Sequence, residues 1–123
     1  MTEDLDSRYR HVLARQLEMN KETWRSLQSH GVTEQTDLRL DFSYVAPNES
    51  SANKLREIIQ DQTDYAVEVQ AEGALFRRTW IVVGSTQPTK VSPAVLDQWV
   101  DWMVTAGLHQ GCEFDGWGTE LPT

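Results

Sequence analysis

The spacing of apolar residues changes repeatedly along the chain, and the order of these changes constrains the fold more than any single motif. Apolar residues recur at helical spacing over about residues 3–29, 48–61 and 92–107. They alternate with polar residues over about 38–45 and 65–71, as in half-buried strands, and two further strands are predicted over about 76–84 and 112–119. The predicted order is one long helix followed by β-α-β-β-α-β.

That order is typical of a ferredoxin-like α+β sandwich, in which two helices cover one face of a four-stranded antiparallel sheet. Right-handed crossovers would place the first and third strands of the unit, at about 37–120, in the middle of the sheet. The third strand agrees, because residues 79–83 are apolar on both faces, as in a covered central strand. Its second face then needs a cover, and we expect the additional N-terminal helix to provide it.

Local signals set the predicted ends of the helices. His30-Gly31 ends the first helix, Asn48 caps the second, Ser92-Pro93 starts the third and Gly107 ends it. The turn between the second and third strands is predicted at Glu72-Gly73. The predicted buried stripes are Leu5, Val12, Leu13, Leu17, Trp24 and Leu27, with Tyr9 and Asn20 on the same side; Ala52, Leu55, Ile58 and Ile59; and Val95, Leu96, Trp99, Val100 and Met103.

Side chains with catalytic or metal-binding chemistry are few and scattered. Asp97 and Asp101 have i,i+4 spacing but face away from the predicted apolar stripe, so we expect a solvated flank. His109 and Cys112 form a pair at zinc-ligand spacing, but zinc takes four ligands and the sequence offers no second pair. We therefore predict no catalytic residues, no metal, no cofactor and no enzymatic activity, with a pocket near Asp115, Cys112 and His109 as the enzyme alternative.

Length and cysteine content suit one cytoplasmic domain. The 123 residues are predicted to form a single α+β domain over 1–123, large enough for a core without disulfides. The one cysteine cannot pair within the chain, which favours a reducing compartment. The acidic start, Met1-Thr2-Glu3-Asp4, does not resemble a signal peptide, and no apolar run reaches membrane-spanning length.

The charge of the chain disfavours nucleic acid as a direct ligand. The formal net charge is −8, and all of it comes from the residues after Gln28, which include 14 acidic and 6 basic side chains. Duplex binding needs a basic surface. RNA-recognition modules stack bases on aromatic residues of a ferredoxin-like sheet, but residues 77–83 lack their signature, and a helix over the open face would block such a platform. An acidic body suits a basic protein partner or serves solubility.

One segment near the end of the chain stands apart from ordinary strand chemistry. Residues 113–119 place two glycines around a tryptophan, next to an acid, and glycine weakens a strand unless the backbone needs it. Its tryptophan is either an interface anchor or a plug between sheet and first helix. The candidate partner-binding residues are Phe114, Asp115, Gly116, Trp117, Gly118 and Thr119.

On this Glu-aromatic-Asp-Gly-Trp-Gly-Thr segment and the order of elements, the chain resembles the RraB family of ribonuclease E regulators. The resemblance implies a non-enzymatic protein that binds the non-catalytic scaffold region of ribonuclease E and alters messenger RNA decay. Two features depart from the family pattern. Family members carry a strongly acidic tail after this segment, which the residues after Thr119 do not provide, and the hairpin at Glu72-Gly73 is short for the family. The partner expected is a protein, either ribonuclease E or a related nuclease. The alternatives are an immunity-like acidic inhibitor of another nuclease or basic protein, and a small-molecule-binding domain or enzyme.

Overall fold

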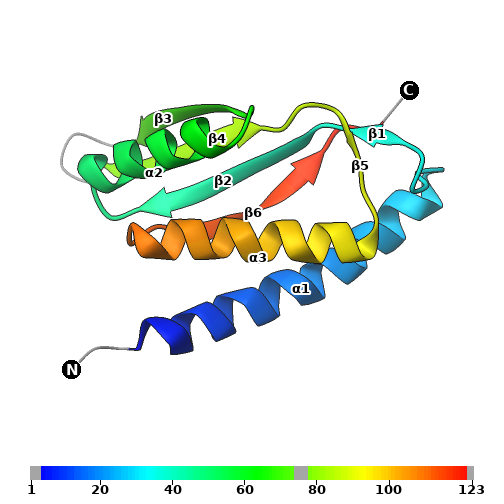
Figure 1. Ribbon diagram of the computed structural model, residues 1–123, viewed down its shortest axis with the longest axis horizontal. Coiled ribbons are helices and arrows are strands. Elements are labelled where there is room, and N and C mark those ends of the chain that lie inside the picture. Colours follow the sequence, from blue (N-terminus) through cyan, green and yellow to red (C-terminus); the bar gives the residue numbers. More distant parts are fainter. Residues whose placement is uncertain (1–3, 74–77, 122–123) are drawn as a thin grey trace.

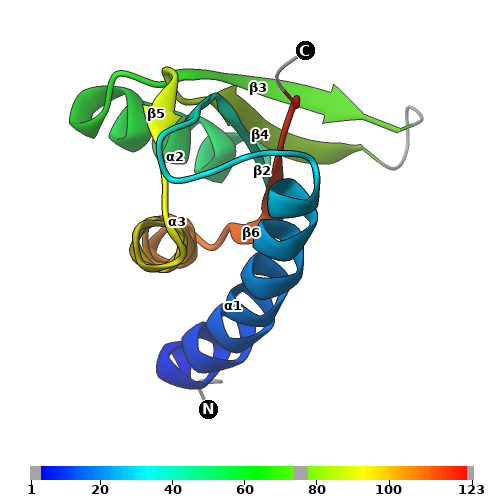
Figure 2. The ribbon, with the colours of Figure 1, turned by 90° about the vertical axis from the view of Figure 1, so that its right-hand side faces the viewer.

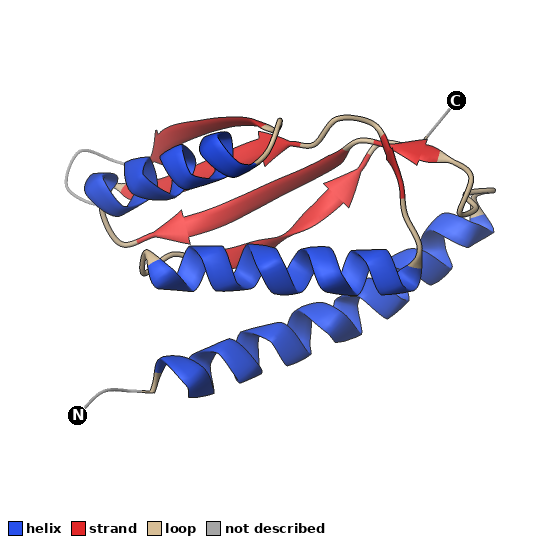
Figure 3. Ribbon diagram, viewed as in Figure 1, coloured by secondary structure: helices blue, strands red, loops and turns tan. Residues whose placement is uncertain are grey.

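The computed structural model describes residues 4–73 and 78–121. These residues form three helices and two antiparallel sheets. Figures 1 and 3 show their arrangement. The elements are α1 (Leu5–Ser29), β1 (Asp37–Leu38), β2 (Leu40–Ala46), α2 (Glu49–Gln62), β3 (Ala66–Glu72), β4 (Thr79–Ser85), β5 (Thr89–Lys90), α3 (Pro93–His109) and β6 (Glu113–Thr119). The predicted α+β class with a long N-terminal helix is confirmed. The predicted start of a strand at Phe76 lies outside the described residues.

The larger sheet has the strand order β3-β4-β2-β6, with every neighbouring pair antiparallel. The first and third strands of the predicted unit, β2 and β4, therefore lie in the middle, as expected. Tyr44 on β2 is paired with Val82 on one side and with Phe114 on the other. Alternation along β2 sends Phe42, Tyr44 and Ala46 to the face covered by α2 and α3, where they join the core, and leaves Val45 exposed on the other face.

Local capping signals start α2 and α3 as predicted. The Asn48 side chain accepts a hydrogen bond from the Ser51 N–H at 2.8 Å, and the Ser92 hydroxyl accepts one from the Val95 N–H at 3.2 Å. The predicted end of α3 at Gly107 is wrong, because the helix continues to His109. Gly107 serves close packing instead: a Cβ there would lie 2.5 Å from Cε2 of the fully buried Tyr44.

The long helix α1 does not cover the open face of the sheet, and that prediction is wrong. It packs along α3 and along β6, and Figure 2 shows β6 lying between the two helices. Ile81 and Val83 on the open face are only half-buried. The buried stripe of α1 includes two polar residues, Gln16 and Asn20, and the Asn20 amide donates a hydrogen bond to Asp97 of α3. Leu5 and Val95, predicted to be buried, are 48% and 46% exposed.

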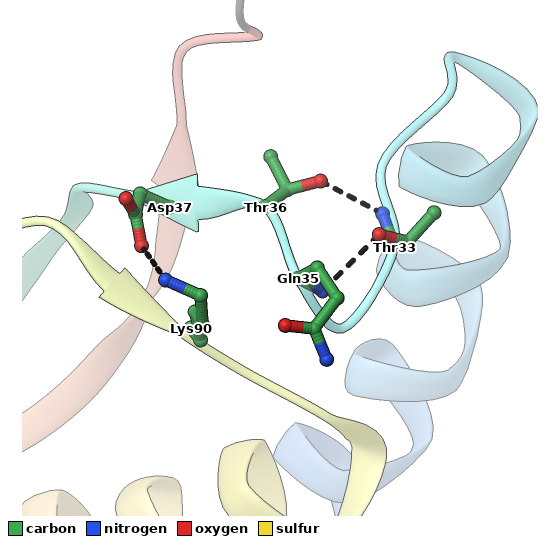
Figure 4. Close-up of polar contacts among 5 residues, drawn as sticks. All are labelled: Thr33, Gln35, Thr36, Asp37 and Lys90. Carbon is green, nitrogen blue, oxygen red and sulfur yellow. Dashed lines mark hydrogen bonds and ion pairs between the residues drawn. The ribbon is translucent and has the colours of Figure 1, made fainter.

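A short two-stranded sheet, β1 with β5, joins the segment after α1 to the segment before α3, and sequence periodicity did not predict it. Asp37 pairs with Lys90, whose ammonium lies 2.9 Å from the Asp37 carboxylate (Figure 4). The turn leading into β1 is held by Thr33 and Thr36, whose hydroxyls accept backbone N–H bonds of 3.1 and 3.0 Å. A second apolar cluster is close to this end of the molecule: Trp24, Leu27, Val32, Leu38, Leu40, Val91 and Leu96.

Candidate functional site

The glycine-tryptophan segment forms the end strand β6, and a β-bulge interrupts its pairing with β2. Tyr44 is opposite Phe114 and Ser43 is opposite Gly116, so that Asp115 is an extra residue in β6. Gly116 has a φ of 128°, a conformation that L side chains rarely adopt. A bulge needs such a local change of backbone, which explains why this strand carries a glycine at position 116.

The bulge sorts the side chains of β6 between the two faces of the sheet. Phe114 is 1% exposed and packs edge-to-face against Tyr44 and Trp99, with ring centroids 5.2 and 6.2 Å apart. Asp115 and Gly118 are exposed. The Phe114 ring is thus part of the core, while the bulged acid and the second glycine face solvent.

The indole of Trp117 joins three elements on the helix side of the sheet. Its Nε1–H donates to Asn20 Oδ1 at 2.8 Å, and its ring lies edge-to-face with Trp99 at 6.1 Å. Asn20 in turn donates through Nδ2 to Asp97 at 3.0 Å. The ring is half-buried at this junction of α1, α3 and β6. Of the two roles considered for Trp117, this geometry favours the plug between sheet and first helix.

Asp97 and Asp101 contact α1, and their predicted role as a solvated flank is wrong. Asp101 accepts a 2.6 Å hydrogen bond from the Tyr9 hydroxyl, and this bond raises the pKa of Tyr9 above its ordinary value. Asp97 accepts the bond from Asn20 described above. The i,i+4 spacing places two carboxylates on the flank of α3 that receives α1, where they act as hydrogen-bond acceptors between helices.

A groove of about 850 Å³ lies on the open face of the sheet, and it brings part of β6 together with residues far apart in the sequence. Asp115, Gly116 and Gly118 line it together with Asp41 of β2 and Glu68 of β3. The sequence placed Asp41 and Glu68 on the polar faces of two strands. Their proximity to Asp115 depends on the strand order and on the bulge, neither of which periodicity reveals.

Thr119, the last candidate of the segment, belongs to the end of the strand and does not line the groove. Its hydroxyl donates to the Arg39 carbonyl at 2.8 Å, across the β2–β6 pair. It therefore fixes the end of β6 where β2 begins.

The alternative pocket of Asp115, Cys112 and His109 does not form around a reactive thiol. Cys112 is fully buried, and burial raises the pKa of its thiol to about 11, which opposes formation of the nucleophilic thiolate. His109 is exposed, and the groove beside Asp115 is lined by neither residue. Within residues 4–73 and 78–121, no three His, Cys, Asp or Glu side chains are grouped closely enough to hold a metal ion.

Over the same described ranges, no helix combines the length and the apolar character that crossing a membrane requires.

Comparison with known proteins identifies the family. The RraB family model, described as regulator of ribonuclease activity B, matches residues 17–119, which include the second half of α1 and both sheets. A search of curated proteins finds no match. The match covers more than four-fifths of the chain and ends at Thr119, the last residue of β6. This chain therefore belongs to the RraB family, whose description is regulator of ribonuclease activity B.

Proposed function

We propose that the chain acts in the cytoplasm as a non-catalytic regulator that binds a ribonuclease directly, with ribonuclease E or a related nuclease as the target. The observation that carries this proposal is the family match over residues 17–119, which includes the glycine-tryptophan segment of β6. Regulation by binding needs a surface but no catalytic group, and the buried, protonated Cys112 thiol fits such a role.

The charge of the chain supports a protein partner with basic segments. Ribonucleases and their scaffolds bind RNA through basic surfaces, because phosphate must be neutralised. An acidic regulator can compete for such surfaces, and opposite charge accelerates the encounter. Beyond α1 this chain carries the whole excess of acids, so the sheet, α2 and α3 are the expected region of contact.

The test is a cleavage assay with purified components. A labelled RNA is incubated with full-length ribonuclease E from the same organism, with and without the purified chain. We expect slower cleavage, together with a stable complex in calorimetry. The isolated catalytic domain of the nuclease is the control, and it should be unaffected if binding occurs at the non-catalytic scaffold. Full-rate cleavage and no heat of binding at a large excess of the chain would rule out ribonuclease E as the target.

A second candidate is the inhibition of a different nuclease or basic toxin, favoured by the same acidic surface. The two candidates separate in one experiment. An inhibitor of another enzyme leaves ribonuclease E unaffected but slows the cleavage of RNA by its own purified target.

A further inference from the structure

The groove on the open face of the sheet has a floor of small and apolar groups. Gly116 and Gly118 contribute no side chains, and a Cβ at Gly118 would have no atom within 4 Å. Val83 and Ala66 line the groove beside them. The helices α2 and α3 lie on the opposite face of the sheet (Figure 2). An extended chain, or the aliphatic stem of a long side chain, can therefore approach the floor closely.

One wall of the groove comes from α1, through Met19. This side chain is 43% exposed, although it is large and apolar. Methionine is flexible and polarizable, and it adapts to partners of varied shape. Because α1 packs along β6 and leaves the open face uncovered, Met19 and the strands bound a groove that is open to solvent.

Carboxylates from three different strands surround this floor. Asp41, Glu68 and Asp115 line the groove and are exposed, and its lining includes no lysine, arginine or histidine. Within the described ranges none of the three takes part in an ion pair. Two are oriented by neutral donors: Ser85 Oγ donates to Asp41 at 2.6 Å, and Gln70 Nε2 donates to Glu68 at 2.8 Å.

We propose that this groove is the docking site for a lysine- or arginine-rich segment of the partner protein. The cationic head groups would pair with Asp41, Glu68 and Asp115, while the aliphatic stems lie on Val83 and against Met19. Phosphate is repelled by the same carboxylates, so RNA is not the occupant. This inference rests on the proposed function in taking the partner to be a protein, and it adds the site and the chemistry of the ligand.

The test uses the whole chain, labelled with ¹⁵N, and three probes: an arginine-alanine repeat peptide, a glutamate-alanine repeat peptide and a single-stranded RNA. Addition of the arginine peptide at low salt should shift the backbone amide signals of Ser43, Val83, Gly116 and Gly118, and leave those of α2 in place. The glutamate peptide and the RNA should shift none of them. Shifts spread over the whole acidic surface, no binding of the arginine peptide, or binding of RNA in the groove would each overturn the inference.

Matched variants separate a built site from general attraction between charges. The groove variant carries Asp41→Asn, Glu68→Gln and Asp115→Asn. The α2 variant carries Glu57→Gln, Asp61→Asn and Asp64→Asn, which are exposed residues on or just after α2. Both lose the same charge. The groove variant should bind the arginine peptide about tenfold more weakly or worse, and the α2 variant within about twofold of the native chain. Equal weakening in both variants would contradict a specific groove.

Failure of this inference and failure of the proposed function give different results. If the chain inhibits the ribonuclease but the arginine peptide leaves the groove amides unmoved, the groove assignment is wrong and the regulatory function stands. If the peptide occupies the groove but the chain neither binds the ribonuclease nor slows its cleavage of RNA, the proposed target is wrong and the groove remains a site for basic segments.

Discussion

Asn20 on α1 accepts a 2.8 Å hydrogen bond from the Trp117 indole on β6, although 97 positions separate the two residues in sequence. The same Asn20 side chain donates to Asp97 on α3. Nearer the start of both elements, Arg8 of α1 lies 3.5 Å from Glu113, the first residue of β6. Arg8 precedes Asn20 in α1, and their partners Glu113 and Trp117 occur in the same order in β6. The helix α1 therefore runs beside β6 in the same direction and does not cross the open face of the sheet.

The first prediction concerns this junction. Asn20→Ala leaves the half-buried indole N–H without its acceptor and should lower the free energy of unfolding by about 1–2 kcal/mol in urea denaturation. Trp117→Phe keeps most of the ring but removes the donor, and should also destabilise. Gln28→Ala, at an exposed position of the same helix, is the control and should change stability by less than about 0.5 kcal/mol. Equal effects of Asn20→Ala and the control would contradict the structural role given to the Asn20–Trp117 bond.

The second prediction contrasts the two glycines of β6. Gly116→Ala forces a side chain into a φ of 128° and should cost about 1–3 kcal/mol of stability. Gly118→Ala meets no atom within 4 Å and has no positive φ, so its effect should stay within about 1 kcal/mol of zero. Thermal unfolding of both variants measures the difference. If Gly118→Ala proved the more damaging substitution, the position of the bulge would be wrong.

The third prediction is a loss of stability at alkaline pH caused by Cys112. Its thiol has a pKa of about 11 in the folded chain, raised by burial, against about 8.5 in an unfolded chain. A raised folded pKa means that the stabilising contribution is complete below about pH 8.5 and is lost as the pH rises toward about 11. Unfolding free energy should fall across this window.

Cys112→Ala provides the control for the alkaline prediction. Removing the thiol costs some packing at every pH. It should also make the free energy of unfolding fall less steeply between about pH 8.5 and 11, where the tyrosines then contribute to the fall that remains. Tyr44 is the largest of these contributions, because its burial raises its pKa well above the ordinary value. Parallel slopes for the native and Cys112→Ala chains would show that the thiol is not protected by burial.

Sequence patterns predicted those parts of the fold that are set by neighbouring residues. The caps at Asn48 and Ser92 and the alternation of β2 depend on a few adjacent positions, and the structure confirms them. The order β-α-β-β-α-β then limits the topology to few choices, and the central places of β2 and β4 follow from the handedness of crossovers.

Sequence patterns could not predict the position of α1 or the residues that line the groove. A helical stripe shows which side is buried but not which neighbour buries it, and here the polar pairs Asn20–Asp97 and Tyr9–Asp101 decide in favour of α3. Gly107 looked like a helix end because glycine often is one, yet it lies against Tyr44 from a distant strand. Asp41, Glu68 and Asp115 become neighbours only through strand order and a bulge.

The most direct test of the regulatory role is the rate of RNA cleavage by ribonuclease E in the presence of the native chain, the groove variant and the α2 variant at equal concentrations. The native chain and the α2 variant should slow cleavage to a similar extent, and the groove variant should need about tenfold more protein for the same effect. Identical inhibition by the groove variant and the native chain would contradict docking through the open face. No inhibition by the native chain would contradict the proposed target.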